Sequence, residues 1–153
     1  MTMPVFESRE EVTHAIIAAR VARGIRWADV ATAVGRSKEW TTAACFGQMT
    51  FSKGEAEALV ALLDLDPSAL AWLQTVPYKG TLGGGAPDDP LLYRWYEMIS
   101  VYGPAIKELI HEEFGDGIMS AIDFKMHIER EPDPAGDRVH VNISGKFLPY
   151  KKY

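Results

Sequence analysis

Apolar side chains recur at helical spacing through the first half of the chain, as expected for helices that each bury one face. Ser8 with Glu11, and Ser52 with Glu55, have the spacing of a capping box, in which a serine and a glutamate close the start of a helix. The pattern predicts five short helices: about 8–24, 27–34, 37–46, 52–63 and a fifth that starts at 66–67.

A more apolar helix is predicted in the second half of the chain. Asp89-Pro90 supplies a capping side chain followed by proline at the first helical position. The helix is expected to run to about Tyr102 and to be interrupted by Gly103-Pro104, because an internal proline removes a backbone hydrogen bond. A further helix then continues to about Phe114.

The last part of the chain alternates between apolar and polar residues. The alternation covers 122–129 and 139–144, on either side of a turn at 131–137 that is rich in Pro, Asp and Gly. This predicts a two-stranded hairpin. Such a hairpin is marginally stable alone, so we expect it to pack on the preceding helix or on another subunit.

These patterns divide the chain into residues 1–76, a linker at 77–88, and residues 89–153. The linker contains three consecutive glycines and lacks the Gly-Lys-Ser/Thr of a phosphate-binding loop. The predicted fold is α+β and mainly α. A five-helix bundle that resembles a helix-turn-helix DNA-binding domain precedes a helix and a two-stranded β-hairpin.

Composition narrows the function classes. The chain has 153 residues, of which 47% are hydrophobic and 24% charged, so global disorder is excluded. The net charge of -5 argues against non-specific nucleic-acid binding, which needs a basic excess. The single cysteine, Cys45, excludes an intrachain disulfide and favours a reducing, cytoplasmic location. No apolar run is long enough for a membrane span, so no membrane partner is expected.

The helix-turn-helix spacing of residues 27–46 leaves a DNA-binding regulator as an alternative function. Its second helix offers Lys38, Thr41 and Thr42 to base edges, whereas Glu39 would repel phosphate. Residues 1–76 hold seven Lys and Arg against nine Asp and Glu, so this half is itself acidic. The same geometry is also a general way to pack small helices.

The helix after the linker carries only two charges between 91 and 103, Arg94 and Glu97. They lie three residues apart and therefore share one face of the helix. A helix that is otherwise apolar belongs in an interior, which other copies of this short half could supply. Two interpretations stay open: a structural ion pair, or an anion-binding site.

Ser120 is a further candidate, because alternation places it on one apolar strand face with Ile118 and Ile122. It could donate a hydrogen bond to a ligand, or act as a nucleophile with His111 and Asp116. No G-x-S-x-G elbow is present, which disfavours a hydrolase. The four histidines form no H-E-x-x-H motif, so no metal site is predicted.

Three segments resemble the cyanase family, also called cyanate hydratase or cyanate lyase. They are Tyr-Arg-x-Tyr-Glu-Met-x-x-Val-Tyr-Gly at 93–103, Phe-Gly-Asp-Gly-Ile-x-Ser-Ala-Ile-x-Phe at 114–124, and Gly-Lys-x-Leu-Pro at 145–149. The resemblance extends over the full length, including Gly-Arg-Ser-Lys at 35–38. The chain therefore resembles the members of this family.

The resemblance implies that cyanate and bicarbonate are converted to carbamate and carbon dioxide, and that carbamate then gives ammonia and carbon dioxide. It implies no metal or organic cofactor, since bicarbonate is a co-substrate. It also implies a decamer of five dimers, with sites at subunit interfaces in a dimerisation and catalytic domain. No nucleic-acid partner is implied, because the family's helix-turn-helix-like half has no known DNA binding.

The family's catalytic residues correspond to Arg94, Glu97 and Ser120 in this sequence, and Ile118 and Leu148 match positions near the substrate. Arg94 would hold an anion with its planar donors, and Ser120 would donate to a substrate oxygen. Glu97 would orient Arg94 or a water, or carry a proton. A catalytically silent oligomeric scaffold remains the third possibility, after the enzyme and the DNA-binding regulator.

Overall fold

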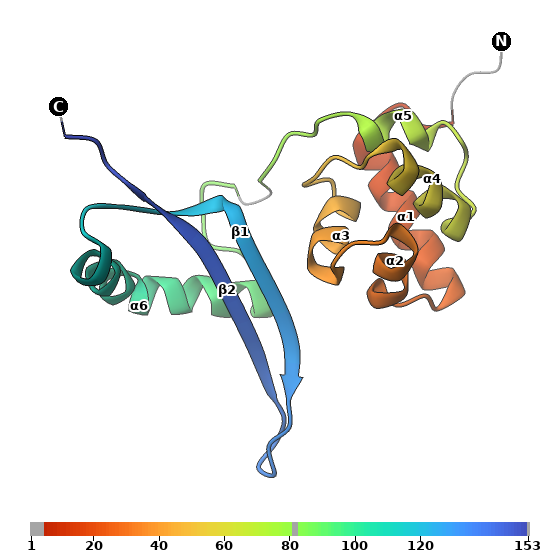
Figure 1. Ribbon diagram of the computed structural model, residues 1–153. Helices are drawn as coiled ribbons and strands as arrows, with labels where there is room; N and C mark the ends of the chain where they lie inside the picture. Colours follow the sequence, from red (N-terminus) through yellow and green to blue (C-terminus); the bar gives the residue numbers. More distant parts are fainter. Residues whose placement is uncertain (1–4, 81–82, 153) are drawn as a thin grey trace. The chain divides into compact units, whose positions relative to one another are not determined.

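The computed structural model describes residues 5–80 and 83–152 and divides into two units, the first ending at Gly80 and the second comprising the rest. Figure 1 shows the first as a cluster of helices and the second as a long helix with a two-stranded hairpin. Within the described ranges, no helix has the length and apolar character needed to cross a membrane. The predicted mainly α, α+β fold is confirmed.

The first unit contains the five predicted helices. Its helix starts follow the predicted caps closely at Ser52, where both halves of the capping box form with Glu55. At Ser8 only the serine half forms, because the Glu11 carboxylate accepts from the Glu7 amide instead. The helices are α1 Arg9–Arg23, α2 Trp27–Val34, α3 Lys38–Cys45, α4 Lys53–Leu63 and α5 Ala69–Gln74.

This unit has its own hydrophobic core. Fully buried side chains come from every helix and from the loop before α4, where Phe51 is enclosed. The Arg9 guanidinium donates to the Ala44 carbonyl at 2.6 Å and so ties the end of α3 to α1. Burial lowers the pKa of Arg9 and raises the pKa of the Cys45 thiol to about 12.

The α2–α3 pair has the shape of a helix-turn-helix, with Gly35 in the left-handed conformation at the turn. The prediction that Thr41 could read base edges is wrong, because its side chain is fully buried in the core. Lys38 also lies 2.6 Å from the Glu39 carboxylate, which offsets its charge. The burial of Thr41 removes one of the three side chains on which DNA reading by α3 depended.

In the second unit, α6 (Pro90–Phe114) is one continuous helix of 25 residues. The predicted interruption at Gly103-Pro104 is therefore wrong. Asp89 caps the start of the helix and Gly115 closes its end. The backbone hydrogen bond that Pro104 cannot donate is therefore one bond lost from a long helix whose two ends are both capped. Gly103, which precedes the proline, has no side chain. A Cβ added there would contact only Ile99, at 3.7 Å, so the helix is not crowded at this point.

The hairpin pairs β1 (Gly117–Glu131) antiparallel with β2 (Arg138–Pro149). β1 begins earlier than the alternation at 122–129 indicated. The pairing is irregular between Met119 and Phe124, where β1 bulges.

The second unit has almost no interior in a single chain. Among its described residues only Gly117 and Ser120 are buried, and none of α6 is. Large apolar side chains such as Leu109, Ile122 and Val139 are mostly exposed. A soluble monomer rarely leaves so much apolar surface uncovered, so this surface indicates an interface.

The Thr41 hydroxyl has no hydrogen-bond partner among the described residues despite its complete burial. Replacing it with a methyl group of similar shape removes an unpaired polar atom from the core. We expect Thr41→Val to raise the free energy of unfolding by about 1–3 kcal/mol. Urea denaturation of the full chain measures this. Thr42→Val is the control on the neighbouring, partly exposed residue, and equal effects of both substitutions would contradict the argument.

Candidate functional site

Arg94 and Glu97 lie in the first turns of α6, which Asp89 fixes by accepting from the amides of Leu91 and Leu92, both at 2.9 Å. Arg94 Nε stands 3.9 Å from Glu97 Oε2, and both side chains are largely exposed. An exposed pair at this distance contributes little to stability. The rest of the guanidinium fork can therefore receive an anion.

A shallow hollow of about 360 Å³ adjoins Arg94. It is formed by the end of the predicted linker and the first turn of α6; its lining residues are Ala86, Pro87, Asp88, Pro90, Tyr93 and Arg94. The sequence pattern predicted 77–88 as a linker and did not predict this wall. The two prolines that stiffen the approach to α6 were the available signal.

Ser120 lies in the bulge of β1, with only 7% of its surface exposed. Its Oγ accepts from the amides of Ile122 at 3.1 Å and Asp123 at 2.9 Å. A hydroxyl oxygen has two lone pairs, so both acceptor positions are occupied. The hydroxyl proton has no acceptor among the residues that the structure describes. Ser120 is thus arranged to donate one hydrogen bond.

The expectation that Ser120 shares a strand face with Ile118 and Ile122 is wrong. Ile122 is 98% exposed and Ile118 47%, whereas Ser120 is buried. The bulge breaks the two-residue alternation on which the expectation rested, and the local turn at the Ser120 oxygen replaces regular pairing.

His111 does not activate Ser120 in the described chain. Its Nε2 lies 3.2 Å from the Gly117 carbonyl, and its Nδ1 lies 3.3 Å from the Lys107 ammonium. Because an ammonium only donates, Nδ1 accepts and Nε2–H donates. Both ring nitrogens are therefore engaged away from Ser120, and the Ser–His–Asp arrangement is not assembled.

Ile118 and Leu148 are brought together as direct partners across the hairpin. Both remain partly exposed and offer an apolar surface beside the bulge. Arg94 and Glu97 are also brought together, but no hydrogen bond or ion pair joins either of them to Ser120 within the described residues.

The continuous α6 sets a lower limit on the distance between the backbones of Arg94 and Ser120 in the same chain. Residues 94 to 114 rise about 30 Å along a helix axis. The six residues from 114 to 120 return at most about 22 Å, even when fully extended. The two Cα atoms therefore stay at least about 8 Å apart, and the turn at Gly115 prevents full extension.

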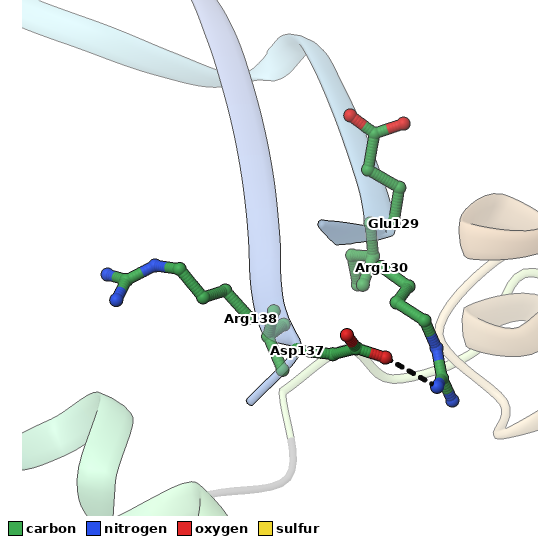
Figure 2. Close-up of a pocket in the computed structure, with 6 residues that line it drawn as sticks. Glu129, Arg130, Asp137 and Arg138 are labelled. Carbon is green, nitrogen blue, oxygen red and sulfur yellow. Dashed lines mark hydrogen bonds and ion pairs between the residues drawn. The ribbon is translucent and has the colours of Figure 1, made fainter. Parts of the chain in front are cut away.

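A second hollow, of about 410 Å³, lies near the closed end of the hairpin (Figure 2). Arg130 and Asp137 form an ion pair there at 2.9 Å, and Arg138 extends away from them. No predicted site residue lines it. Within the described residues, His, Cys, Asp and Glu do not gather in a group of three or more that could hold a metal ion.

Comparison with known proteins covers both units. Residues 9–77 match the family described as "Cyanate hydratase, N-terminal", and residues 85–152 match "Cyanate lyase C-terminal domain". The chain belongs to the cyanate hydratase family. The predicted resemblance is therefore confirmed.

Individual relatives are similar over nearly their whole length. A cyanate hydratase of Polynucleobacter asymbioticus is 64% identical over 145 residues, covering 95% of this chain and 99% of the relative. One from Cupriavidus necator is 64% identical over 146 residues with the same coverage. A crystal structure of cyanase from T. urticae matches with a TM-score of 0.78 and 35% identity, covering 90% of this chain and 96% of that one.

The hydrogen bonds that Ser120 accepts give it a role in the stability of the β1 bulge, in addition to its candidate role in the site. Ser120→Ala removes both hydrogen bonds that the Ile122 and Asp123 amides make to Oγ, each worth about 0.5–1.5 kcal/mol, so we expect the free energy of unfolding to fall by about 1–3 kcal/mol. Urea denaturation measures the change. Ser144→Ala, at an exposed serine of the same hairpin, is the control and should change stability by less than about 0.5 kcal/mol. A loss no larger at Ser120 than at Ser144 would contradict this assignment.

Proposed function

We propose that this chain is a cyanate hydratase, a lyase that decomposes cyanate with bicarbonate to carbamate and carbon dioxide. Carbamate then gives ammonia and carbon dioxide. The observation that carries the proposal is an arginine–glutamate pair in residues 91–103 of α6, a stretch with no other charge, in a chain that is 64% identical to cyanate hydratases. The proposal includes no metal or organic cofactor and a cytoplasmic location.

The reaction joins two anions. A bicarbonate oxygen adds to the cyanate carbon, which forms a C–O bond and places negative charge on the cyanate nitrogen. Cleavage of the bond between that oxygen and the bicarbonate carbon releases carbon dioxide and leaves carbamate. The bicarbonate hydroxyl proton and one added proton both end on nitrogen, so that cyanate, bicarbonate and one proton give carbamate and carbon dioxide. Holding both anions together supplies up to about 7–11 kcal/mol in favourable intramolecular cases.

Arg94 is the proposed anion ligand. The chain has a net charge of -5, so two anionic substrates need a local positive group. The planar guanidinium offers paired donors to a carboxylate-like group, and its loose contact with Glu97 leaves most of them available. Glu97 is proposed to orient Arg94 or a water, or to pass the required proton.

Ser120 is proposed to donate to a substrate oxygen and not to attack as a nucleophile. The occupied lone pairs of its oxygen and the engagement of His111 elsewhere support this role. No covalent intermediate is needed, because bicarbonate itself is the nucleophile. Ile118 and Leu148 are proposed to form an apolar wall that excludes water and strengthens the polar contacts.

We further propose that sites form between copies of the chain, in a decamer of five dimers. Two observations support association. The apolar surface of α6 and of the hairpin lacks an interior in one chain. Within the described residues, no hydrogen bond or ion pair joins Arg94 to Ser120 of the same chain. Packing several copies together would cover that surface and could bring Arg94 of one copy to Ser120 of another.

Purified full-length protein should release ammonia from cyanate only when bicarbonate is present. Arg94→Ala should reduce this turnover by at least about a hundredfold, because the substrates lose their charge-matched ligand. Arg26→Ala is the matched control, since Arg26 also pairs with an acid three residues later, Asp29. Absence of turnover by the parent chain would overturn the proposed activity, and full activity of Arg94→Ala would overturn the role of Arg94.

Leu109→Glu should prevent or weaken assembly, because it places a charge on the apolar surface of α6. Val21→Glu is the control on α1, where the exposed fraction is 64%, against 63% for Leu109. Light scattering gives the mass of each variant. The parent and Val21→Glu should have the mass of about ten chains, and a monomeric parent would contradict the proposed decamer.

A further inference from the structure

The bulge of β1 that holds Ser120 is unusually large. Met119 pairs with Phe147, and Phe124 pairs with Gly145. The four residues 120–123 therefore stand opposite Lys146 alone, where a regular ladder would place one residue. The extra length of β1 folds back and turns the Ser120 side chain into the buried position described above.

Gly145 lies directly against this folded segment. A Cβ added at Gly145 would overlap the carbonyl oxygen of Ser120 and would lie 2.6 Å from Met119 Cγ. The methionine side chain can move aside, since it is flexible. The Ser120 carbonyl cannot move without shifting the backbone that carries the hydroxyl.

The backbone conformation does not explain a glycine at this position. Gly145 is not among the glycines with positive φ, so an ordinary residue could adopt its dihedral angles. The requirement is one of space, at the point where β2 passes beneath the bulge.

We propose that Gly145 is a positioning residue for the Ser120 hydroxyl: its missing side chain lets the bulge close onto β2 and so sets where the hydroxyl donates. The inference rests on the proposed function, in which Ser120 contacts substrate. A methyl group at 145 displaces the Ser120 backbone, and a displacement of about 1 Å costs on the order of a hundredfold in rate.

The test is Gly145→Ala in the full-length protein. We expect kcat to fall by roughly ten- to a hundredfold, with assembly unchanged by light scattering. Gly54→Ala is the control, because a Cβ there meets nothing within 4 Å. Parent-like turnover by Gly145→Ala would overturn the proposal, and so would loss of assembly, which would show a role in the fold alone.

Two combined variants test whether Gly145 acts through Ser120. In the Ser120→Ala background, Gly145→Ala should lower the residual kcat no further, since the hydroxyl is already absent. A full additional loss would indicate a general structural effect and overturn the proposal.

Met119→Ala together with Gly145→Ala removes the side-chain overlap but keeps the carbonyl overlap. We expect no recovery of kcat. Recovery would assign the effect to Met119 and overturn the role of Ser120. The two proposals fail in different ways. A parent chain without cyanate turnover would overturn the proposed function itself. An active parent with an equally active Gly145→Ala variant would overturn only the role of Gly145.

Discussion

Burial of the apolar surface of α6 and of the hairpin is the constraint on which the second unit depends. Each large apolar side chain left in water forgoes about 1.5–3 kcal/mol, and α6 alone exposes many of them. The first unit meets the same constraint internally, through Phe51 and its neighbours. In the proposed assembly the second unit meets it by packing against other copies of the chain, so its folding and its proposed catalysis would depend on one association.

Local signals predicted most of the elements. Ser52 and Asp89 fix helix starts through contacts within three residues, and glycines such as Gly35 fix helix ends by their own conformation. Such effects act over one turn and can be read from neighbouring residues. Gly103-Pro104 was misjudged because helix continuity is cooperative, so one missing bond does not end a long helix closed at both ends.

Some residues of the candidate site could likewise be predicted from local sequence signals, and others could not. Arg94 and Glu97 were predictable, since helical spacing alone places them on one face. The surroundings of Ser120 were not, because the bulge depends on the pairing of β1 with β2 and on Gly145 in the second strand. The base-reading role predicted for Thr41 was wrong for the same reason, since the packing of the other helices decides which face of α3 is buried.

The placement of Arg94 on α6 and of Ser120 in the β1 bulge has a genetic consequence. If Arg94 and Ser120 of different chains complete each site, a subunit damaged at one position still carries the other intact. Two inactive versions of the gene, one altered at each position, would then restore activity when expressed together, because mixed assemblies contain some undamaged pairs. Each subunit would contribute residues to more than one site. Dissociation of the assembly into single chains would therefore abolish turnover without any change in the covalent structure of the chain.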